Sequence, residues 1–236
     1  MAGHGGQRHL KRQLLPLQSA VPRKGSRWVK KSSPGKHKAS ESLSLLALLR
    51  DRLSLVESAR QAKKLLQDGM VLLDGLKVKS LDLPVGLMDV VSLPKTGVNY
   101  RIIIEKGVFM AKEINAEQAK LKYCRINGKA IIRKGKVQVN LHDSRNVLME
   151  KEEDRFATGD TLVISIPKQA VKSFLKMENG ANCLIFKGKH AGAVGILEEI
   201  LPRAGSMPSN ARLNVGGVPV VTLKDYLIVV DKDFKA

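Results

Sequence analysis

The chain has 236 residues, enough for two or three small domains, and its 41 Lys and Arg residues outnumber 22 Asp and Glu residues by 19. Such an excess predicts a polyanionic partner, either a nucleic acid or an acidic membrane surface. The sequence shows no apolar run of about 18 residues and no signal peptide, so we expect no membrane segment. Cys124 and Cys183 stand far apart without a CxxC pattern, which argues against a zinc site or a disulfide framework.

The first 40 residues form a basic leader. They contain ten Lys and Arg residues and no Asp or Glu, interrupted by Gly, Pro and Ser. Since the leader offers no periodic apolar face, we expect it to be irregular or disordered alone and to become ordered on its partner. A solubilising tail is the alternative, but Leu14, Leu15, Leu17 and Trp28 stand between the charges and favour binding.

A first helix is predicted from an apolar stripe at helical spacing, made of Leu46, Leu49, Leu53 and Val56. The expected N-cap is Ser40 or Ser42, with Glu41 favourable near the helix start. Arg50 and Arg52 lie off the stripe. They are therefore surface residues, either simply solvated or in contact with a partner.

A second, basic helix is predicted to begin after Ser58. Ser58 and Gln61 fit a capping box, and Gly69 stands where a left-handed C-terminal cap is needed. One helix face is expected to pack through Ala59, Ala62 and Leu66. Another face collects the polar and basic side chains Arg60, Lys63, Lys64 and Gln67.

A tight hairpin is predicted directly after the basic helix. Asp74-Gly75 is a two-residue turn between an apolar strand over 70–73 and a second strand over 76–79, with Lys77 and Lys79 on one face. Helix and hairpin together would present an L-shaped cationic surface. An ordinary solvated helix beside an ordinary hairpin is the alternative interpretation.

Residues 95 to about 175 are typical of a small β-rich domain. Hairpins are predicted around Lys106-Gly107 and around Asn127-Gly128, and a short capped helix over 115–121. Further strands are expected over 137–141, 147–149 and 161–166. His142 and Asp143 suggest catalysis, but adjacent residues of an extended segment point to opposite faces and no nucleophile accompanies them. We therefore expect a turn with a solvent-exposed or RNA-facing His142.

The last block, from residue 177, contains FKGKHAGAVGI at 186–196 between two predicted strands. Its glycines allow tight turns and close backbone approach. A phosphate-binding Walker loop is excluded, because His190 follows Lys189 and Cys183 stands where the first Gly belongs. Lys187, Lys189 and His190 are then candidate contacts to RNA or protein, or simply solubilising loop residues. Strands over 213–215, 218–223 and 226–230 complete the block.

These runs carry a family resemblance. The segment 58–75 resembles the alpha-L RNA-binding module of ribosomal protein S4 and its relatives, and 186–196 resembles a KOW motif. In order and spacing, the whole chain resembles the archaeal and eukaryotic small-subunit ribosomal protein S4e family, in its shorter archaeal-type form. The matching runs are HLKR at 9–12, Trp28, SPGKHK at 33–38, LLRDRL at 48–53, PVGLMDVVS at 84–92, LHDSRN at 141–146 and TGD at 158–160.

The resemblance implies an α+β multidomain fold. It comprises a basic extended leader (1–40), an alpha-L module (41–94), a β-rich central domain (95–176) and a KOW-containing, SH3-like barrel (177–236). The implied function is that of a cytoplasmic, structural constituent of the small ribosomal subunit that binds and stabilises folded rRNA. Neighbouring small-subunit proteins are the other expected partners. No cofactor, metal, catalytic residue, membrane or small-molecule substrate is expected.

Charge pattern and resemblance together imply a set of RNA-contacting residues. They are His9, Lys11, Arg12, Lys24, Arg27, Trp28, Lys36, His37, Lys38, Arg50, Arg52, Arg60, Lys63, Lys64, Lys77, Lys79, Lys187, Lys189 and His190. Two alternatives remain. An RNA-modifying enzyme could use the alpha-L module for targeting, but such an enzyme needs an attached catalytic domain with its own signature. A transcription or translation factor could use the barrel for protein binding, but that does not explain the basic leader.

Overall fold

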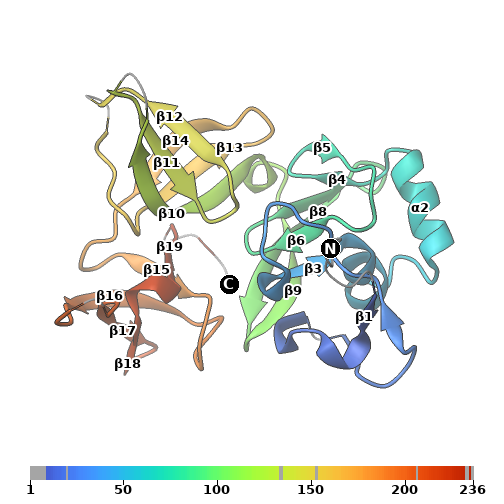
Figure 1. Ribbon diagram of the computed structural model, residues 1–236, viewed down its shortest axis with the longest axis horizontal. Helices are drawn as coiled ribbons and strands as arrows, with labels where there is room; N and C mark the ends of the chain where they lie inside the picture. The colour runs from blue at the N-terminus through green and yellow to red at the C-terminus, as the bar shows by residue number, and fades with distance from the viewer. Residues whose placement is uncertain are drawn as a thin grey trace, which may run out of the picture.

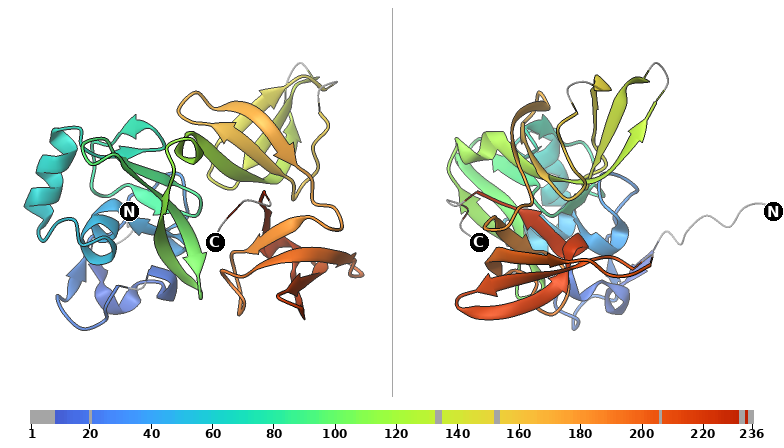
Figure 2. Two further views of the ribbon diagram at one scale, coloured as in Figure 1. Left: turned by 180° about the vertical axis from the view of Figure 1, so that it is seen from behind. Right: turned by 90° about the vertical axis from the view of Figure 1, so that its left-hand side faces the viewer.

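The computed structural model describes residues 9–19, 21–132, 135–151, 154–205, 207–231 and 234. These residues form three five-stranded antiparallel sheets, two two-stranded sheets and few helices, so the protein is mostly β rather than evenly α+β. Two of the large sheets lie one above the other, and the third, with helix α2, lies beside them (Figure 1). The view from behind shows the same arrangement (Figure 2).

The described part of the leader is folded against the rest of the chain, which corrects the expectation of disorder. Strand β1 (Leu10–Lys11) pairs with β2 (Trp28–Val29), and short 3-10 turns η1 (Arg12–Leu14), η2 (Leu17–Ser19) and η3 (Ala39–Glu41) complete it. Val21 and Val29 are buried, and Val21 belongs to the largest hydrophobic cluster. The leader therefore contributes apolar side chains to the core, although its own sequence shows no periodic apolar pattern.

The first predicted helix is shorter and less regular than expected. Helix α1 (Leu45–Ala47) continues into a π-helical turn, η4 (Leu48–Arg52). Its N-cap is Ser44, whose hydroxyl accepts a hydrogen bond from the Ala47 amide at 3.4 Å. Ser40 and Ser42 are not the cap, because 42–44 form strand β3 (Ser42–Ser44), which pairs with β6 (Pro84–Gly86). The predicted burial of the stripe is confirmed for Leu46, Leu49 and Val56.

Helix α2 (Ala59–Gln67) begins as predicted. The Ser58 hydroxyl accepts from the Gln61 amide at 3.3 Å, and the Gln61 side chain accepts from the Ser58 amide at 3.2 Å, which completes the capping box. Ala62 and Leu66 are buried, whereas Ala59 is exposed, contrary to the prediction. Gly69 follows the helix with φ +65°, the left-handed conformation expected of its C-terminal cap.

The sheet beside α2 has the strand order β5-β4-β7-β8-β9. Its strands are β4 (Leu72–Leu73), β5 (Leu76–Lys77), β7 (Val90–Leu93), β8 (Val98–Glu105) and β9 (Val108–Ile114). Asp74 and Gly75, with φ +51° and +74°, form the predicted turn between β4 and β5. The predicted hairpin around Lys106-Gly107 joins β8 to β9. This sheet continues across the division expected between residues 94 and 95.

The central sheet has the order β12-β11-β10-β13-β14. Its strands are β10 (Leu121–Ile131), β11 (Val137–Leu141), β12 (Asn146–Met149), β13 (Thr161–Ser165) and β14 (Ala170–Leu175). Asn127-Gly128 is not a hairpin turn: it lies inside β10, at a bulge in the pairing with β11. The capped helix expected over 115–121 is only the 3-10 turn η5 (Gln118–Lys120), which has no side-chain cap.

The C-terminal sheet has the order β18-β17-β16-β15-β19. Its strands are β15 (Asn182–Ile185), β16 (Val194–Leu201), β17 (Asn210–Val215), β18 (Val218–Leu223) and β19 (Leu227–Val229), with the turn η8 (Lys224–Tyr226) before β19. The glycines of 186–196 were expected to allow close approach of another backbone segment. Gly192 does so within the chain, since a Cβ on it would lie 2.7 Å from the Glu105 Cα. The loop between β15 and β16 thus rests on the β8–β9 hairpin, where the Gly107 amide bonds Ala191 O at 3.0 Å.

Candidate nucleic-acid interface

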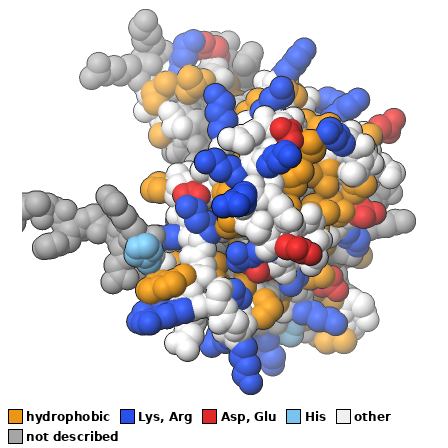
Figure 3. Space-filling model, turned by 90° about the vertical axis from the view of Figure 1, so that its right-hand side faces the viewer, with side chains coloured by type: hydrophobic (Ala, Val, Ile, Leu, Met, Phe, Trp, Pro, Cys, Tyr) orange, Lys and Arg blue, Asp and Glu red, His pale blue; other side chains and the backbone are white. Residues whose placement is uncertain are grey.

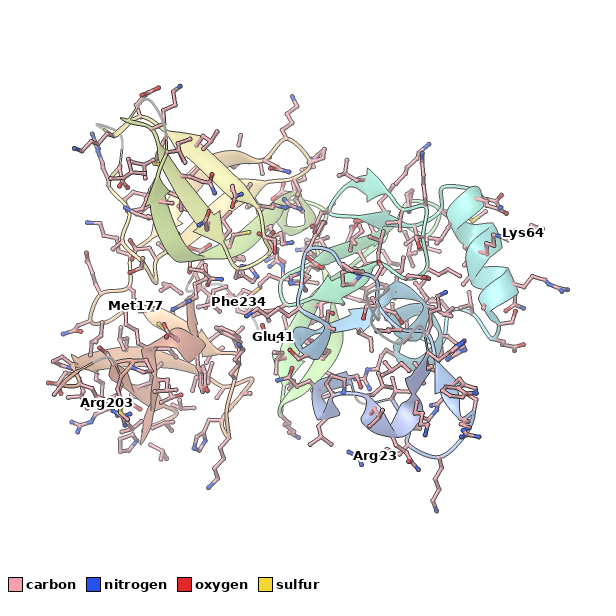
Figure 4. All side chains as sticks on the ribbon, in the orientation of Figure 1. Arg23, Glu41, Lys64, Met177, Arg203 and Phe234 are labelled. Atoms are coloured by element: carbon pink, nitrogen blue, oxygen red, sulfur yellow. The ribbon has the colours of Figure 1, made fainter. Side chains whose placement is uncertain are left out.

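Five of the predicted contact residues form an exposed surface that we call the basic face: Arg60, Lys63, Lys64, Lys77 and Lys79. The first three lie on α2, and the other two follow the Asp74-Gly75 turn. Helix and hairpin meet where Gly69 lies beside Lys77, since a Cβ on Gly69 would be 3.6 Å from the Lys77 Cε. Lys and Arg side chains are spread over the side of the molecule that carries α2 (Figure 3). Lys64 points away from the body (Figure 4).

A second exposed group lies in the leader. The Trp28 side chain is 49% exposed, with the His9 ring 5.5 Å away between centroids and the Arg27 guanidinium 5.2 Å above its ring. Lys11, Lys24 and Lys38 are exposed nearby in the sequence. An exposed aromatic ring surrounded by cations can contact both the bases and the phosphates of a nucleic acid.

Two predicted contact residues are buried, which corrects the expectation that they face a partner directly. Arg12 donates hydrogen bonds from Nε to Ser26 O at 2.8 Å and from Nη1 to Pro22 O at 2.7 Å, so it holds the leader loop together. His37 Nε2 lies 3.0 Å from Asp89 Oδ2, with its side chain only 4% exposed. Both residues therefore shape the leader from inside.

Four more of the predicted residues are partly buried and bonded within the chain. Lys36 Nζ lies 2.7 Å from Asp74 Oδ2, and Lys187 Nζ lies 2.8 Å from Glu41 Oε1. Arg50 pairs with the adjacent Asp51, and Arg52 donates to Phe109 O at 2.9 Å. Lys189 and His190, in the loop between β15 and β16, are exposed.

A cluster of buried charges, for which the sequence carries no signal, lies where the leader, the α2 sheet and the central sheet meet. We call it the charged junction: Asp74, Asp89, Lys122, Asp143 and Arg145. Lys122 is fully buried, and its ammonium nitrogen lies 2.9 Å from Asp74 Oδ2 and 3.1 Å from Asp143 Oδ2, and also bonds Asp89. Arg145 joins Asp74 at 2.6 Å and Asp143 at 3.2 Å.

The charges of the junction compensate one another. Three carboxylates face Lys122, Arg145 and, from the leader, Lys36. Burial opposes the charged form of Asp89, but Lys122 and His37 outweigh it and hold the pKa of Asp89 well below its ordinary value. Burial likewise opposes ionisation of Asp143, yet Lys122 and Arg145 keep its pKa low. The junction thus links three parts of the chain through ion pairs between side chains that have lost their water.

His142 is only partly exposed, so the expectation of a solvent-exposed ring is corrected, while the RNA-facing alternative stays a prediction. Its Nδ1 accepts from the Arg125 amide at 3.2 Å, and its Nε2 lies 3.3 Å from Leu87 O, a pattern that fits the neutral ring. Burial lowers the pKa of His142 to about 4, and the nearby Lys122 and His37 act in the same direction. Since both ring nitrogens are engaged, His142 is not placed to act as a general base.

The expected divergence of His142 and Asp143 is also wrong, because both converge on Cys124. One ligand atom from each of the three lies within 4.8 Å of the others. Lys122 and Arg145 already occupy Asp143, however, and burial with the Asp143 charge raises the pKa of the Cys124 thiol well above its ordinary value. A metal ion needs a thiolate and would face two cations here, so the donor set does not fit a metal.

Comparison with known proteins identifies the class. The S4 domain model matches residues 45–91, which contain α2 and the Asp74-Gly75 turn, and the model of the ribosomal family S4e matches residues 96–171. The chain thus carries an S4 RNA-binding domain.

Among its described residues, no helix is long and apolar enough to cross a membrane.

The relatives extend over the whole chain. The small ribosomal subunit protein eS4 of Methanocaldococcus jannaschii is 43% identical over 98% of this chain and 96% of that protein. The protein of the same name from Methanothermobacter thermautotrophicus is 39% identical over 99% and 96%. The crystal structure of the 30S ribosomal protein S4e from Thermoplasma acidophilum superposes with a TM-score of 0.70 at 26% identity, covering 82% of this chain and 96% of that one. This chain belongs to the ribosomal S4e family.

Proposed function

We propose that the chain is a non-enzymatic, structural constituent of the small ribosomal subunit that binds folded rRNA. The observation that carries this proposal is the basic face on the S4 domain, where five cations are exposed together on a helix and an adjacent hairpin. Phosphates of a folded RNA would be neutralised there without any rearrangement of the fold. The names of the full-length relatives agree with this assignment.

The predicted contacts divide into two roles. Direct contacts come from the exposed residues: His9, Lys11, Lys24, Arg27, Trp28 and Lys38 in the leader, the basic face, and Lys189 and His190 in the C-terminal loop. Arg12, Lys36 and His37 act indirectly: Arg12 holds the leader loop together from inside, and the bonds of Lys36 and His37 hold the leader against the junction. Arg50, Arg52 and Lys187 are intermediate, since each would have to leave an internal partner to meet RNA.

We also propose that residues 177–236 form an SH3-like barrel with a KOW motif, which faces neighbouring small-subunit proteins. The motif's strand–loop–strand order and its close glycine contacts support this. Ile196 and Val221 are 51% and 54% exposed on β16 and β18 and would suit a protein neighbour. The leader and the module over 41–94 then form the RNA side, with the sheet extending into the domain over 95–176.

The experiment that tests the proposal measures the salt dependence of binding to small-subunit rRNA. Replacing Arg60, Lys63 and Lys64 together with Ala is expected to flatten the slope of log K against log salt by roughly 2 to 3, at about 0.7 to 0.9 per phosphate contact. The matched control replaces Lys168, Lys172 and Lys176, which are exposed along the β13–β14 hairpin and just beyond β14. An equal change in both variants would mean that only net charge matters, and the role of the basic face would be rejected.

A further inference from the structure

A cleft of about 300 Å³ opens where the leader, the α2 sheet, the central sheet and the C-terminal sheet meet. Its apolar floor includes Ile104, Phe109 and Phe186, and its polar wall includes Arg125 and Lys187. Glu41, which also lines it, lies near the centre of the molecule (Figure 4). The volume is at the lower end of the roughly 300 to 1,000 Å³ range of small-molecule pockets, so it suits one nucleotide rather than a helix.

Arg125 is the unusual member of this wall. It is 7% exposed, and its Nη1 donates to Asn127 Oδ1 at 3.0 Å while Nη2 pairs with Asp225 Oδ1 at 2.9 Å. Its Nε is buried and has no hydrogen-bond partner. A buried, charged donor without a partner is costly, so this N–H is expected to be satisfied by a group from outside the chain.

The partner already on Arg125 can move away from it. The Asp225 side chain is 62% exposed, so its carboxylate can turn into water, whereas Arg125 stays buried at the cleft. Nε and Nη2 form one edge of a guanidinium, and this edge matches two oxygens of a phosphate. A phosphate that displaced Asp225 would therefore gain both donors, including the one that is now unpaired.

The remaining lining suggests what the phosphate is attached to. Phe186 lies partly buried at the cleft with Lys187 Nζ 5.4 Å from its ring centre, beside the buried Phe109 and Ile104. An aromatic ring with apolar neighbours accepts a nucleobase by stacking. Lys38 stands at the same opening for further phosphate oxygens, and Lys187 could join it on leaving Glu41, its partner at 2.8 Å.

We propose that this cleft binds one unpaired nucleotide, with its phosphate on the Nε–Nη2 edge of Arg125 in place of Asp225 and its base against Phe186. The nucleotide comes from an extruded position in an RNA chain, in which case the site extends the proposed rRNA binding, or it is a free mononucleotide. In the free protein Asp225 acts as an internal competitor for the phosphate.

The test uses the full chain with a single-stranded RNA of about five nucleotides, adenosine 5′-monophosphate and inorganic phosphate as probes. The NMR signal of the Arg125 Nε–H, assigned by its loss in Arg125→Lys, is expected to shift when a nucleotide probe binds. Asp225→Asn should tighten nucleotide binding about threefold or more by removing the competitor. Glu178→Gln is the matched control, since Glu178 is also exposed and paired with one lysine.

The outcomes separate the sources. Binding of the RNA but not of the monophosphate assigns an RNA nucleotide, and comparable binding of both assigns a free one. An Arg125 signal that no probe moves, or equal effects of Asp225→Asn and Glu178→Gln, would overturn the proposal. If Arg125→Lys does not fold, the nucleotide affinities of Asp225→Asn and Glu178→Gln still decide whether the proposal holds. Binding of rRNA through the basic face is judged by its own salt slope, so failure here leaves that result standing.

Discussion

The charged junction and the basic face are made of the same kinds of residue but are used in opposite ways. At the junction, Lys122 and Arg145 are buried against Asp74, Asp89 and Asp143. On the basic face, the cations of α2 and of the hairpin remain in water. Asp74 connects the two regions, because the same turn that folds the hairpin also supplies a carboxylate to the junction.

The two regions differ in how the charges of so basic a chain are balanced. Cations that would repel one another in the interior are matched by carboxylates, and the unmatched ones are left at the surface. The junction fixes the leader and the central sheet around the S4 domain. Under the proposed function, the basic face would approach RNA as a preformed surface, without first losing the conformational entropy of its own folding.

The largest expected effect follows from removing the centre of the junction. Lys122→Met would leave three buried carboxylates with too few cations, so the free energy of unfolding should fall by about 3 to 5 kcal/mol. Lys136→Met is the control, because Lys136 is exposed and pairs with Glu150 at the surface; its loss should change the free energy of unfolding far less. Urea denaturation measures both, and equal small losses would show that the junction contributes no more than a surface pair.

The next effect concerns the leader. Deleting residues 1–38 would remove the His37 bond to Asp89, the Lys36 bond to Asp74 and the buried side chains of Val21 and Val29. We expect the remaining chain to lose about 3 to 4 kcal/mol and to melt at a lower temperature. An unchanged thermal transition would mean that the leader only rests on a core that is complete without it.

Local patterns predicted local structure well. The Ser58–Gln61 capping box, the Asp74-Gly75 turn and the hairpin around Lys106-Gly107 all depend on residues a few positions apart, and all three are confirmed. Asn127-Gly128 failed for a tertiary reason. Strand β10 pairs with β13 through residues 121–125 and with β11 through 126–131, so the strand runs through the turn signal and absorbs it as a bulge.

The charged junction had no signal in the sequence. Lys122 sits in a strand between Leu121 and Tyr123, and its carboxylate partners are Asp74, Asp89 and Asp143, which lie 48, 33 and 21 positions away by subtraction. Nothing local distinguishes a buried lysine from an exposed one in an alternating strand. The burial of the leader was missed for the same reason, since Val21 packs on residues distant in the chain.

A smaller effect on stability is expected when the pH is lowered, because His142 then titrates in the unfolded chain. The pKa of His142 is about 4 in the folded protein, lowered by burial, and about 6.5 in an unfolded chain. Between these values the unfolded chain binds a proton that the folded protein does not, so stability falls as the pH falls through this window. From pH 6.5 to 4.5 the loss should be about 2 kcal/mol.

Urea denaturation at the two pH values tests this, with His142→Gln as the comparison. The variant has no group to titrate at this position, so most of the difference between the two pH values should disappear. Asp89 and Asp143 titrate below this window in the folded state. Burial raises their pKa values, but the charge of Lys122 outweighs burial and lowers them. A pH dependence that persists in the variant would assign it to groups other than His142.

The smallest effect on stability is expected on the basic face. Replacing Arg60, Lys63 and Lys64 with Ala removes exposed side chains from a helix whose buried face is formed by Ala62 and Leu66. Each change should alter the free energy of unfolding by less than about 0.5 kcal/mol, and Ala is itself a strong helix former. The same variant should nevertheless flatten the salt slope of rRNA binding. A large loss of stability would show that these cations, like Lys122, support the fold, and the contrast between the two regions would then fail.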